Sequence, residues 1–207
     1  MLIKLTDYQR IYHTIQALLL QDRVAATDVS MLFSVYAAQI LKHHYGLQAQ
    51  PVAGAMAIHL GPGKIFSYGQ LQAGQLQATN EHQQWWVEVD GWLIDFTAPL
   101  LPLLYKRTGN KGTQVPFKML QKPLADCLEN WQSLRQAGEI WKAEDDDLTV
   151  SGLQRLASNP GHIARGQAAV KWYVKPPKTQ SSPMTITLSN GQRATYSLGS
   201  QSLSGAW

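Results

Sequence analysis

Residues 84–97, QWWVEVDGWLIDFT, are the stretch that decides the fold. Two runs rich in aromatic and β-branched residues flank Asp90-Gly91, a dipeptide typical of a two-residue type I′ turn. The spacing therefore predicts an antiparallel β-hairpin closed by that turn. The pairs expected across the ladder, from the turn outward, are Val89 with Trp92, Trp86 with Asp95, and Gln84 with Thr97.

Because side chains alternate along a strand, this hairpin has two different faces. One face is wholly apolar and is expected in the core; it carries Trp85, Val87, Val89, Trp92, Ile94 and Phe96. The opposite face carries Gln84, Trp86, Glu88, Leu93, Asp95 and Thr97. Polar side chains beside aromatic ones favour a covered cleft, which makes this face the candidate functional surface. An ordinary solvent-facing surface is the equal alternative.

Helices are predicted in front of the hairpin. Thr6 and Gln9 have capping-box spacing, and apolar residues then recur at helical intervals. A second helix is predicted to begin at Thr27 or Asp28, both good N-caps, and to stop at Gly46.

Strands are predicted at residues 51–60 and 63–71, followed by a surface loop over 70–84. Beyond the hairpin, residues 99–116 form a connection interrupted by proline. A third helix is predicted from Pro123, and its apolar stripe consists of Leu124, Cys127, Leu128, Trp131 and Leu134.

The rest of the chain is predicted to be helical and then β-structured. An acidic break at 143–147 precedes helices near 149–158 and 163–173. Residues 176–183 have linker composition, and 185–198 read as a second hairpin.

The chain is therefore expected to divide into an α+β domain over residues 1–175 and a small β-appendage over 176–207. The turn of the second hairpin falls on Asn190-Gly191. The pattern leaves open whether this hairpin folds back onto the domain or pairs with another chain, so it is a possible oligomer contact.

Composition restricts the class of protein. The 207 residues are 44% hydrophobic and 15% charged, which is typical of a folded globular chain. The net charge of +4 is spread out, so a nucleic-acid partner is not expected. No apolar run approaches the roughly 20 residues that cross a bilayer, and no signal peptide is recognisable. A single cysteine, Cys127, suits a reducing compartment, so a soluble cytoplasmic protein is expected.

No cofactor or metal site is predicted. The adjacent pair His43-His44 points in two directions on a helix, which prevents both rings from binding one ion unaided. There is no phosphate loop and no dinucleotide fingerprint. Cys127 lies on an apolar stripe and is expected to be a small core residue rather than a nucleophile.

Three features follow one another along the chain: a helix ending in glycine, the strand segment Val52-Ala53-Gly54, and the run WVEVDGWLIDFTAP (86–99). This order resembles the transglutaminase-like branch of the papain-like cysteine-proteinase fold, over roughly residues 25–100. Within that superfamily the chain looks closest to a small bacterial family of unknown function. The resemblance implies a cysteine-proteinase-like α+β core, with N-terminal helices packed on an antiparallel sheet.

The resemblance also implies a catalytic layout, which this chain keeps only in part. In such enzymes a Cys begins the helix, a His stands two residues before the hairpin Trp, and an Asp lies on the returning strand. The Cys position falls on Ser30 or, as the weaker alternative, Val29. The His position falls on Gln84, which cannot act as a general base, and the Asp position falls on Asp95.

Two functional hypotheses follow. The favoured one is a catalytically lapsed binding or regulatory protein, which holds a small molecule or peptide at Gln84, Trp86, Glu88 and Asp95. The alternative is a hydrolase or acyltransferase acting on amide or thioester groups. It would use Ser30 as nucleophile, His82 as base and Asp95 to orient the base. The plain alternative for Ser30 is a first-turn helical residue that satisfies a free backbone amide.

Overall fold

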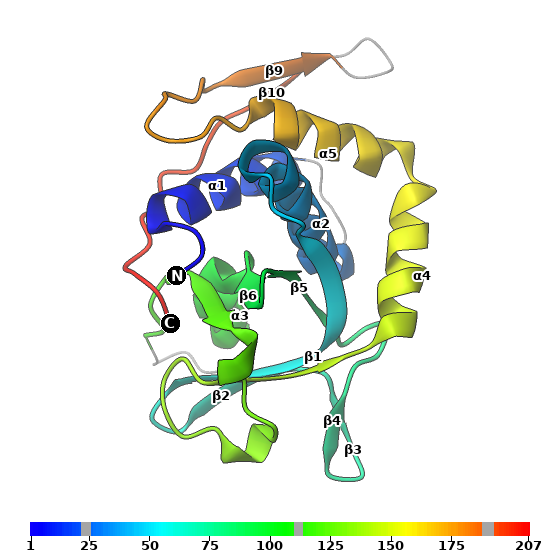
Figure 1. Cartoon of the computed structure of the whole chain (residues 1–207), viewed down its shortest axis with the longest axis vertical. Coiled ribbons are helices and arrows are strands. Elements are labelled where there is room, and N and C mark those ends of the chain that lie inside the picture. The colour runs from blue at the N-terminus through cyan, green and yellow to red at the C-terminus, as the bar shows by residue number, and fades with distance from the viewer. Residues whose placement is uncertain (22–25, 110–113, 188–192) are drawn as a thin grey trace.

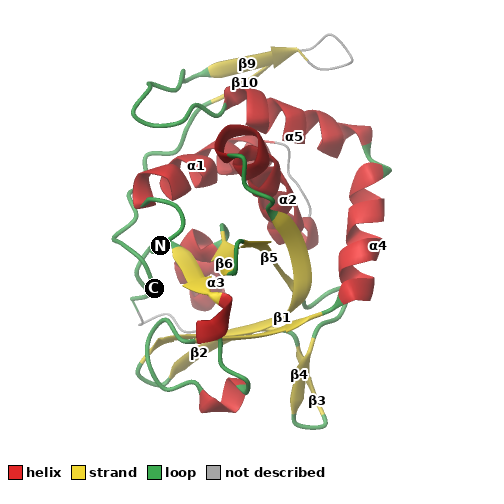
Figure 2. Cartoon of the chain, viewed as in Figure 1, coloured by secondary structure: helices red, strands yellow, loops and turns green. Residues whose placement is uncertain are grey.

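The computed structural model of the chain describes residues 1–21, 26–109, 114–187 and 193–207 (Figure 1). Its α-helices are α1 (Leu5–Gln21), α2 (Ala26–Tyr45), α3 (Leu101–Arg107), α4 (Asp146–Ala157) and α5 (Pro160–Trp172). Its strands are β1 (Gln50–Gly61), β2 (Lys64–Tyr68), β3 (Gln70–Gln72), β4 (Gln75–Gln77), β5 (Gln84–Val89), β6 (Trp92–Asp95), β7 (Leu120–Pro123), β8 (Ile140–Glu144), β9 (Met184–Thr187) and β10 (Arg193–Tyr196). The fold is a mixed α+β fold with a curled antiparallel sheet, as Figure 2 shows.

The long strand β1 organises this sheet. Along one edge, residues 56–61 pair antiparallel with β2. Along the same edge, residues 50–54 pair with β5, and from β5 the sheet continues through β6 to β7. Residues 54–58 pair with β8 along the opposite edge, because Gly54 has partners in both β5 and β8, and residues 56–58 have partners in both β2 and β8. Strands β5 and β2 therefore follow one another along one edge of β1, and β8 pairs with the other edge.

Gly54 lies between β5 and β8, where it is opposite Gln84 on β5 and Glu144 on β8. A Cβ atom at this position would lie 2.0 Å from the backbone oxygen of Ala143 and 2.9 Å from Cη2 of Trp86. Both distances are far below van der Waals contact, so only a residue without a side chain fits between β5 and β8.

Substitution of Gly54 by alanine is therefore expected to lower the free energy of unfolding by about 3 kcal/mol, because a backbone oxygen cannot move aside without breaking the β1–β8 ladder. Denaturation with urea, followed by circular dichroism, measures this loss.

Gly63→Ala is the matched control, since Gly63 has φ +67° and an added Cβ there meets nothing within 4 Å. It should cost about 1 kcal/mol, the usual penalty of a left-handed backbone. Equal costs for the two substitutions would contradict the steric argument.

Helices cover one face of the β5–β6 hairpin. The main core joins α1, α2 and α5 to the hairpin residues Trp85, Val87, Val89, Ile94 and Phe96. Tyr8 of α1 stacks on Phe96 with ring centroids 4.7 Å apart. The predicted core face of the hairpin is therefore confirmed, with Trp92 half-buried at its edge.

Most elements expected before residue 98 are confirmed, with small differences at their ends. The second helix occupies Ala26–Tyr45 and stops before Gly46, which has φ +70°. The first helix begins at Leu5, so Thr6 lies inside it rather than capping it. The expected loop over 70–84 contains an additional small hairpin, β3–β4.

The prediction of a helix from Pro123 is wrong. The segment instead forms the short 3-10 turns η2 (Leu124–Asp126) and η3 (Trp131–Ser133). Pro123 belongs to β7, where it pairs with Trp92, and Leu128 forms a bridge with Trp141. The apolar side chains of this segment pack in separate clusters, so their helical spacing does not reflect a helix.

Other differences lie in the connections between predicted elements. The connection predicted over 99–116 begins with the 3-10 turn η1 (Ala98–Leu100) and helix α3, with proline in the first turn of each. The stretch predicted as an acidic break, 143–147, contains the end of β8 and the start of α4. Asp145 caps α4 by accepting a hydrogen bond from the backbone of Leu148.

The C-terminal segment folds back onto the rest of the chain. Strands β9 and β10 pair as expected, and Figure 1 shows them above α1 and α5. The turn predicted at Asn190-Gly191 lies outside the described residues. Tyr196 and Leu203 are buried in the main core, and Met119 hydrogen-bonds to Gly205 and Trp207. The two termini consequently lie near each other.

Candidate functional site

The predicted hairpin register is confirmed. Val89 pairs with Trp92, and the ladder continues through Glu88 opposite Leu93. Asp90 and Gly91 have φ values of 49° and 75°, as a type I′ turn requires. This register brings Gln84, Asp95 and Thr97 together on the face opposite the main core.

The three side chains form a closed hydrogen-bond network. Gln84 donates from Nε2 to Oδ2 of Asp95 at 2.8 Å and to Oγ1 of Thr97 at 2.7 Å. Thr97 donates from both its backbone N–H and its Oγ1 hydroxyl to Oδ1 of Asp95, each at 2.7 Å. Both amide hydrogens of Gln84 are therefore used, and both oxygens of Asp95 accept.

This network is buried. Gln84, Asp95 and Thr97 are 1%, 2% and 3% exposed, and Trp86 is fully covered. A second apolar core closes over this face; it includes Met56, Ile58, Leu60, Trp86, Leu93, Leu101, Tyr105, Leu120 and Ile140. The solvent-facing alternative is wrong for these side chains, because residues of β1, β7 and α3 cover them. Their role in binding stays a prediction.

Burial is the main influence on the carboxyl group of Asp95 and raises its pKa above the ordinary value of 3.8. Hydrogen bonds from Thr97, Gln84 and the backbone of Ala98 oppose that rise, because they favour the charged form. Tyr8 donates its hydroxyl to the backbone oxygen of Asp95, which links the network to α1.

Thr97→Val removes a hydroxyl that both donates and accepts within the network. We expect it to lower the free energy of unfolding by about 1–3 kcal/mol, since a buried donor of Gln84 loses its partner. Thr185→Val is the matched control, because the Thr185–Thr195 contact at 3.2 Å is exposed. That control should change stability by less than about 0.5 kcal/mol. Equal losses of unfolding free energy in the two variants, measured by urea denaturation, would show that the network does not stabilise the fold more than an exposed contact does.

Asp95→Asn tests the raised pKa. The folded state holds the Asp95 proton more tightly than the unfolded chain does. The protonated carboxyl therefore contributes fully to stability below pH 3.8, and this contribution is lost as the pH rises through the raised pKa of the folded state. Asparagine does not titrate. The advantage of the native protein over Asp95→Asn in free energy of unfolding should therefore shrink as the pH rises across that window. A denaturation series over pH measures it, and an advantage that grows would contradict the shift.

The other two residues of the proposed catalytic set lie apart from this network. Ser30 is in the first turns of α2 and is partly exposed. His82 is exposed, in a turn where its backbone N–H and C=O both bond to Thr79, and β5 begins only at Gln84. Among the described residues, the Asp95 carboxylate is hydrogen-bonded to Gln84, Thr97 and Ala98, not to His82.

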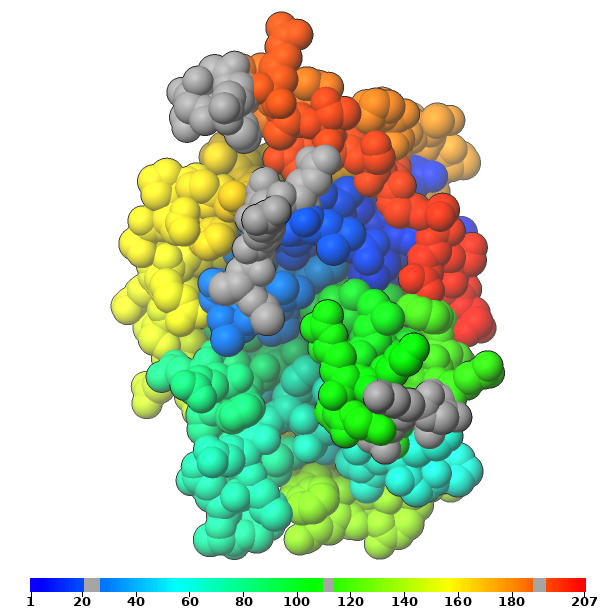
Figure 3. Space-filling model, turned by 180° about the vertical axis from the view of Figure 1, so that it is seen from behind, coloured from blue at the N-terminus to red at the C-terminus, as the bar shows by residue number. Residues whose placement is uncertain are grey.

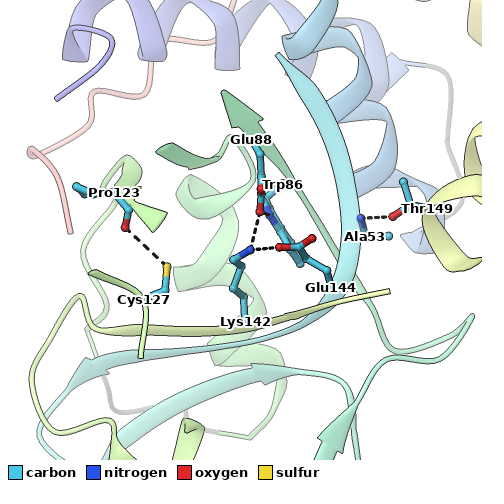
Figure 4. Close-up of polar contacts among 8 residues, drawn as sticks. All are labelled: Ala53, Trp86, Glu88, Pro123, Cys127, Lys142, Glu144 and Thr149. Atoms are coloured by element: carbon cyan, nitrogen blue, oxygen red, sulfur yellow. Dashed lines mark hydrogen bonds and ion pairs between the residues drawn. The ribbon is translucent and has the colours of Figure 1, made fainter. Parts of the chain in front are cut away.

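The outer end of the same hairpin face leads toward the surface. Glu88 accepts hydrogen bonds at 2.8 Å from Nε1 of Trp86 and from Nζ of Lys142 on β8. Lys142 also pairs with Glu144 and lies 5.8 Å from the ring centroid of Trp86. Figure 4 shows Lys142 between the two carboxylates. The composition of β8 gives no sign of this link, since it depends on the β1–β8 pairing.

Cys127 is half-buried near this cluster, and its thiol contacts the backbone oxygen of Pro123 at 3.9 Å (Figure 4). Burial raises its pKa, and the charges of Lys142 and Lys122 oppose the rise. It packs at the margin of the second apolar core, which agrees with the expected packing role although the helix is absent.

A cleft of about 520 Å³ lies beyond Glu144, a size within the usual range of ligand pockets. Its lining comes from three separate segments, namely 74–78 around β4, 129–132 around η3, and Trp141 with 143–145 at the end of β8. Figure 3 shows the first two segments side by side at the base of the molecule. The sequence gives no sign of this cleft, because its residues are brought together only by the pairing of β8 with β1.

The described residues include no helix that is long and apolar enough to span a membrane. Within the same residues, no cluster of three or more His, Cys, Asp or Glu side chains is placed to hold a metal ion.

The family described as a protein of unknown function (DUF2026) matches residues 4–207, and the chain belongs to this family. A solved crystal structure, described as that of a genomics target, is similar over 100% of this chain and 98% of its own. The two share 31% sequence identity and a TM-score of 0.89. No curated protein matches the chain.

Proposed function

Starting from this family membership, we propose that the protein is a non-catalytic binding or regulatory protein on a cysteine-proteinase-like scaffold whose reaction has lapsed. The observation that carries the proposal is the hydrogen bond from Gln84 Nε2 to Asp95 Oδ2. It occupies the carboxylate oxygen that would otherwise orient a catalytic base.

The chemistry of the three positions supports loss of the reaction. The Gln84 amide donates both its hydrogens and has no basic nitrogen, so it takes up no proton near neutral pH. The hydroxyl of Ser30 is a poor nucleophile without a base, since its proton has no acceptor of suitable strength. His82 is on an exposed turn, while Asp95 is fully enclosed.

The cleft beside β8 is the binding surface in this proposal. Trp86 and Glu88 act as positioning residues, because their hydrogen bonds hold Lys142 against Glu144 at the cleft wall. Gln84 and Asp95 act further inside, where they fix the hairpin that carries Trp86 and Glu88.

A serine-directed fluorophosphonate, followed by peptide mass spectrometry, tests the absence of a reactive serine. We expect no label on Ser30, with a known serine hydrolase in the same tube as positive control. Labelling of Ser30 in the native protein that disappears in Ser30→Ala and His82→Ala would overturn the proposal. It would support instead a hydrolase or acyltransferase that uses Ser30, His82 and Asp95.

A further inference from the structure

Two indole rings form the apolar part of the cleft. Trp131 begins η3 and Trp141 lies on β8, and both pack from behind on a small apolar core. Trp141 is held by a hydrogen bond from its Nε1 to the backbone oxygen of Glu129 at 3.2 Å. Each ring is only partly buried and lines the cleft, so it offers a fixed flat surface to a ligand.

Uncharged amide groups surround these rings. The side chains of Gln75, Gln77 and Gln132 line the cleft, and none has a hydrogen-bond partner among the described residues. Each amide supplies two donors and one acceptor oxygen. The cleft thus presents both kinds of hydrogen-bonding group next to flat apolar surfaces.

The charges that line the cleft are carboxylates. No lysine or arginine is among its lining residues, which disfavours an anionic ligand. Of the three carboxylates, Glu144 pairs with Lys142, and Asp145 accepts a hydrogen bond from the backbone of Leu148. The side chain of Glu129 has no partner within the described part of the chain. A cationic ligand is therefore the competing class, which the spermidine probe below tests.

We infer that this cleft binds a neutral carbohydrate, with the apolar faces of sugar rings against Trp131 and Trp141 and the hydroxyl groups bonded to Gln75 and Gln77. Sugar rings have apolar C–H faces and a rim of hydroxyls that each donate and accept, which matches indole surfaces bordered by amides. The cavity of about 520 Å³ accommodates a short oligosaccharide. The inference rests on the proposed function in taking this cleft as the binding surface.

Titration calorimetry of the full chain with maltotetraose, cellotetraose and chitotetraose tests the inference. We expect at least one of them to bind with a Kd of about 1 mM or lower. Trp131→Ala and Trp141→Ala should weaken that binding about tenfold or more. Circular dichroism verifies that these partly buried substitutions leave the chain folded.

Surface variants provide the matched comparison if a tryptophan variant fails to fold. Gln75→Ala and Gln77→Ala should each weaken binding severalfold. Gln72 and Gln70, their partners across the β3–β4 ladder, do not line the cleft, so Gln72→Ala and Gln70→Ala should bind as the native chain does. Equal effects on both sides of the ladder would overturn the inference.

Spermidine serves as a cationic probe. The inference is overturned if none of the three sugars binds while spermidine binds in a salt-sensitive way that Glu129→Gln abolishes. The ligand class would then be a polyamine rather than a carbohydrate. Failure of all four probes to bind overturns it as well. Neither outcome affects the labelling test at Ser30, so failure of the ligand class and failure of the non-catalytic proposal are distinguishable.

Discussion

The structure depends on the close approach of β5 and β8 to Gly54 from the two edges of β1. Gly54 pairs with both strands, and the backbone oxygen of Ala143 lies where any Cβ would be placed. The missing side chain leaves room for Trp86 of β5 to lie beside Lys142 of β8. The buried hairpin and the open cleft are therefore parts of one arrangement, joined across β1 by the ion pair between Glu88 and Lys142.

The polar face of the hairpin illustrates how burial changes the meaning of a polar residue. A carboxylate and an amide in a strand are compatible with a site open to ligand, and the sequence allows that interpretation. In the structure, a second core covers them, and Gln84, Asp95 and Thr97 satisfy one another. A buried polar group that is fully paired specifies packing and register more directly than it supports chemistry.

The cleft has the opposite character. Its side chains are ordinary in sequence, with glutamines in a small hairpin and two tryptophans separated by nine residues. They become a site because 74–78, 129–132 and 141–145 meet around an apolar base of Ala55, Ala57, Leu76 and Leu134. The free amides face a space of ligand size, whereas the amide of Gln84 faces only its own network.

Short-range features were determined by the sequence itself. The Asp90-Gly91 turn sets the hairpin register, and alternation sets its faces, because both depend on backbone geometry within a few residues. The helices α2, α4 and α5 follow from local periodicity and caps. Only the tertiary structure decided the rest: that residues 124–134 are turns, that β8 joins β1, and that a cleft opens there. These outcomes depend on contacts between residues far apart in the chain, which are about 80–90 positions apart in the β1–β8 pairing and which local propensity does not encode.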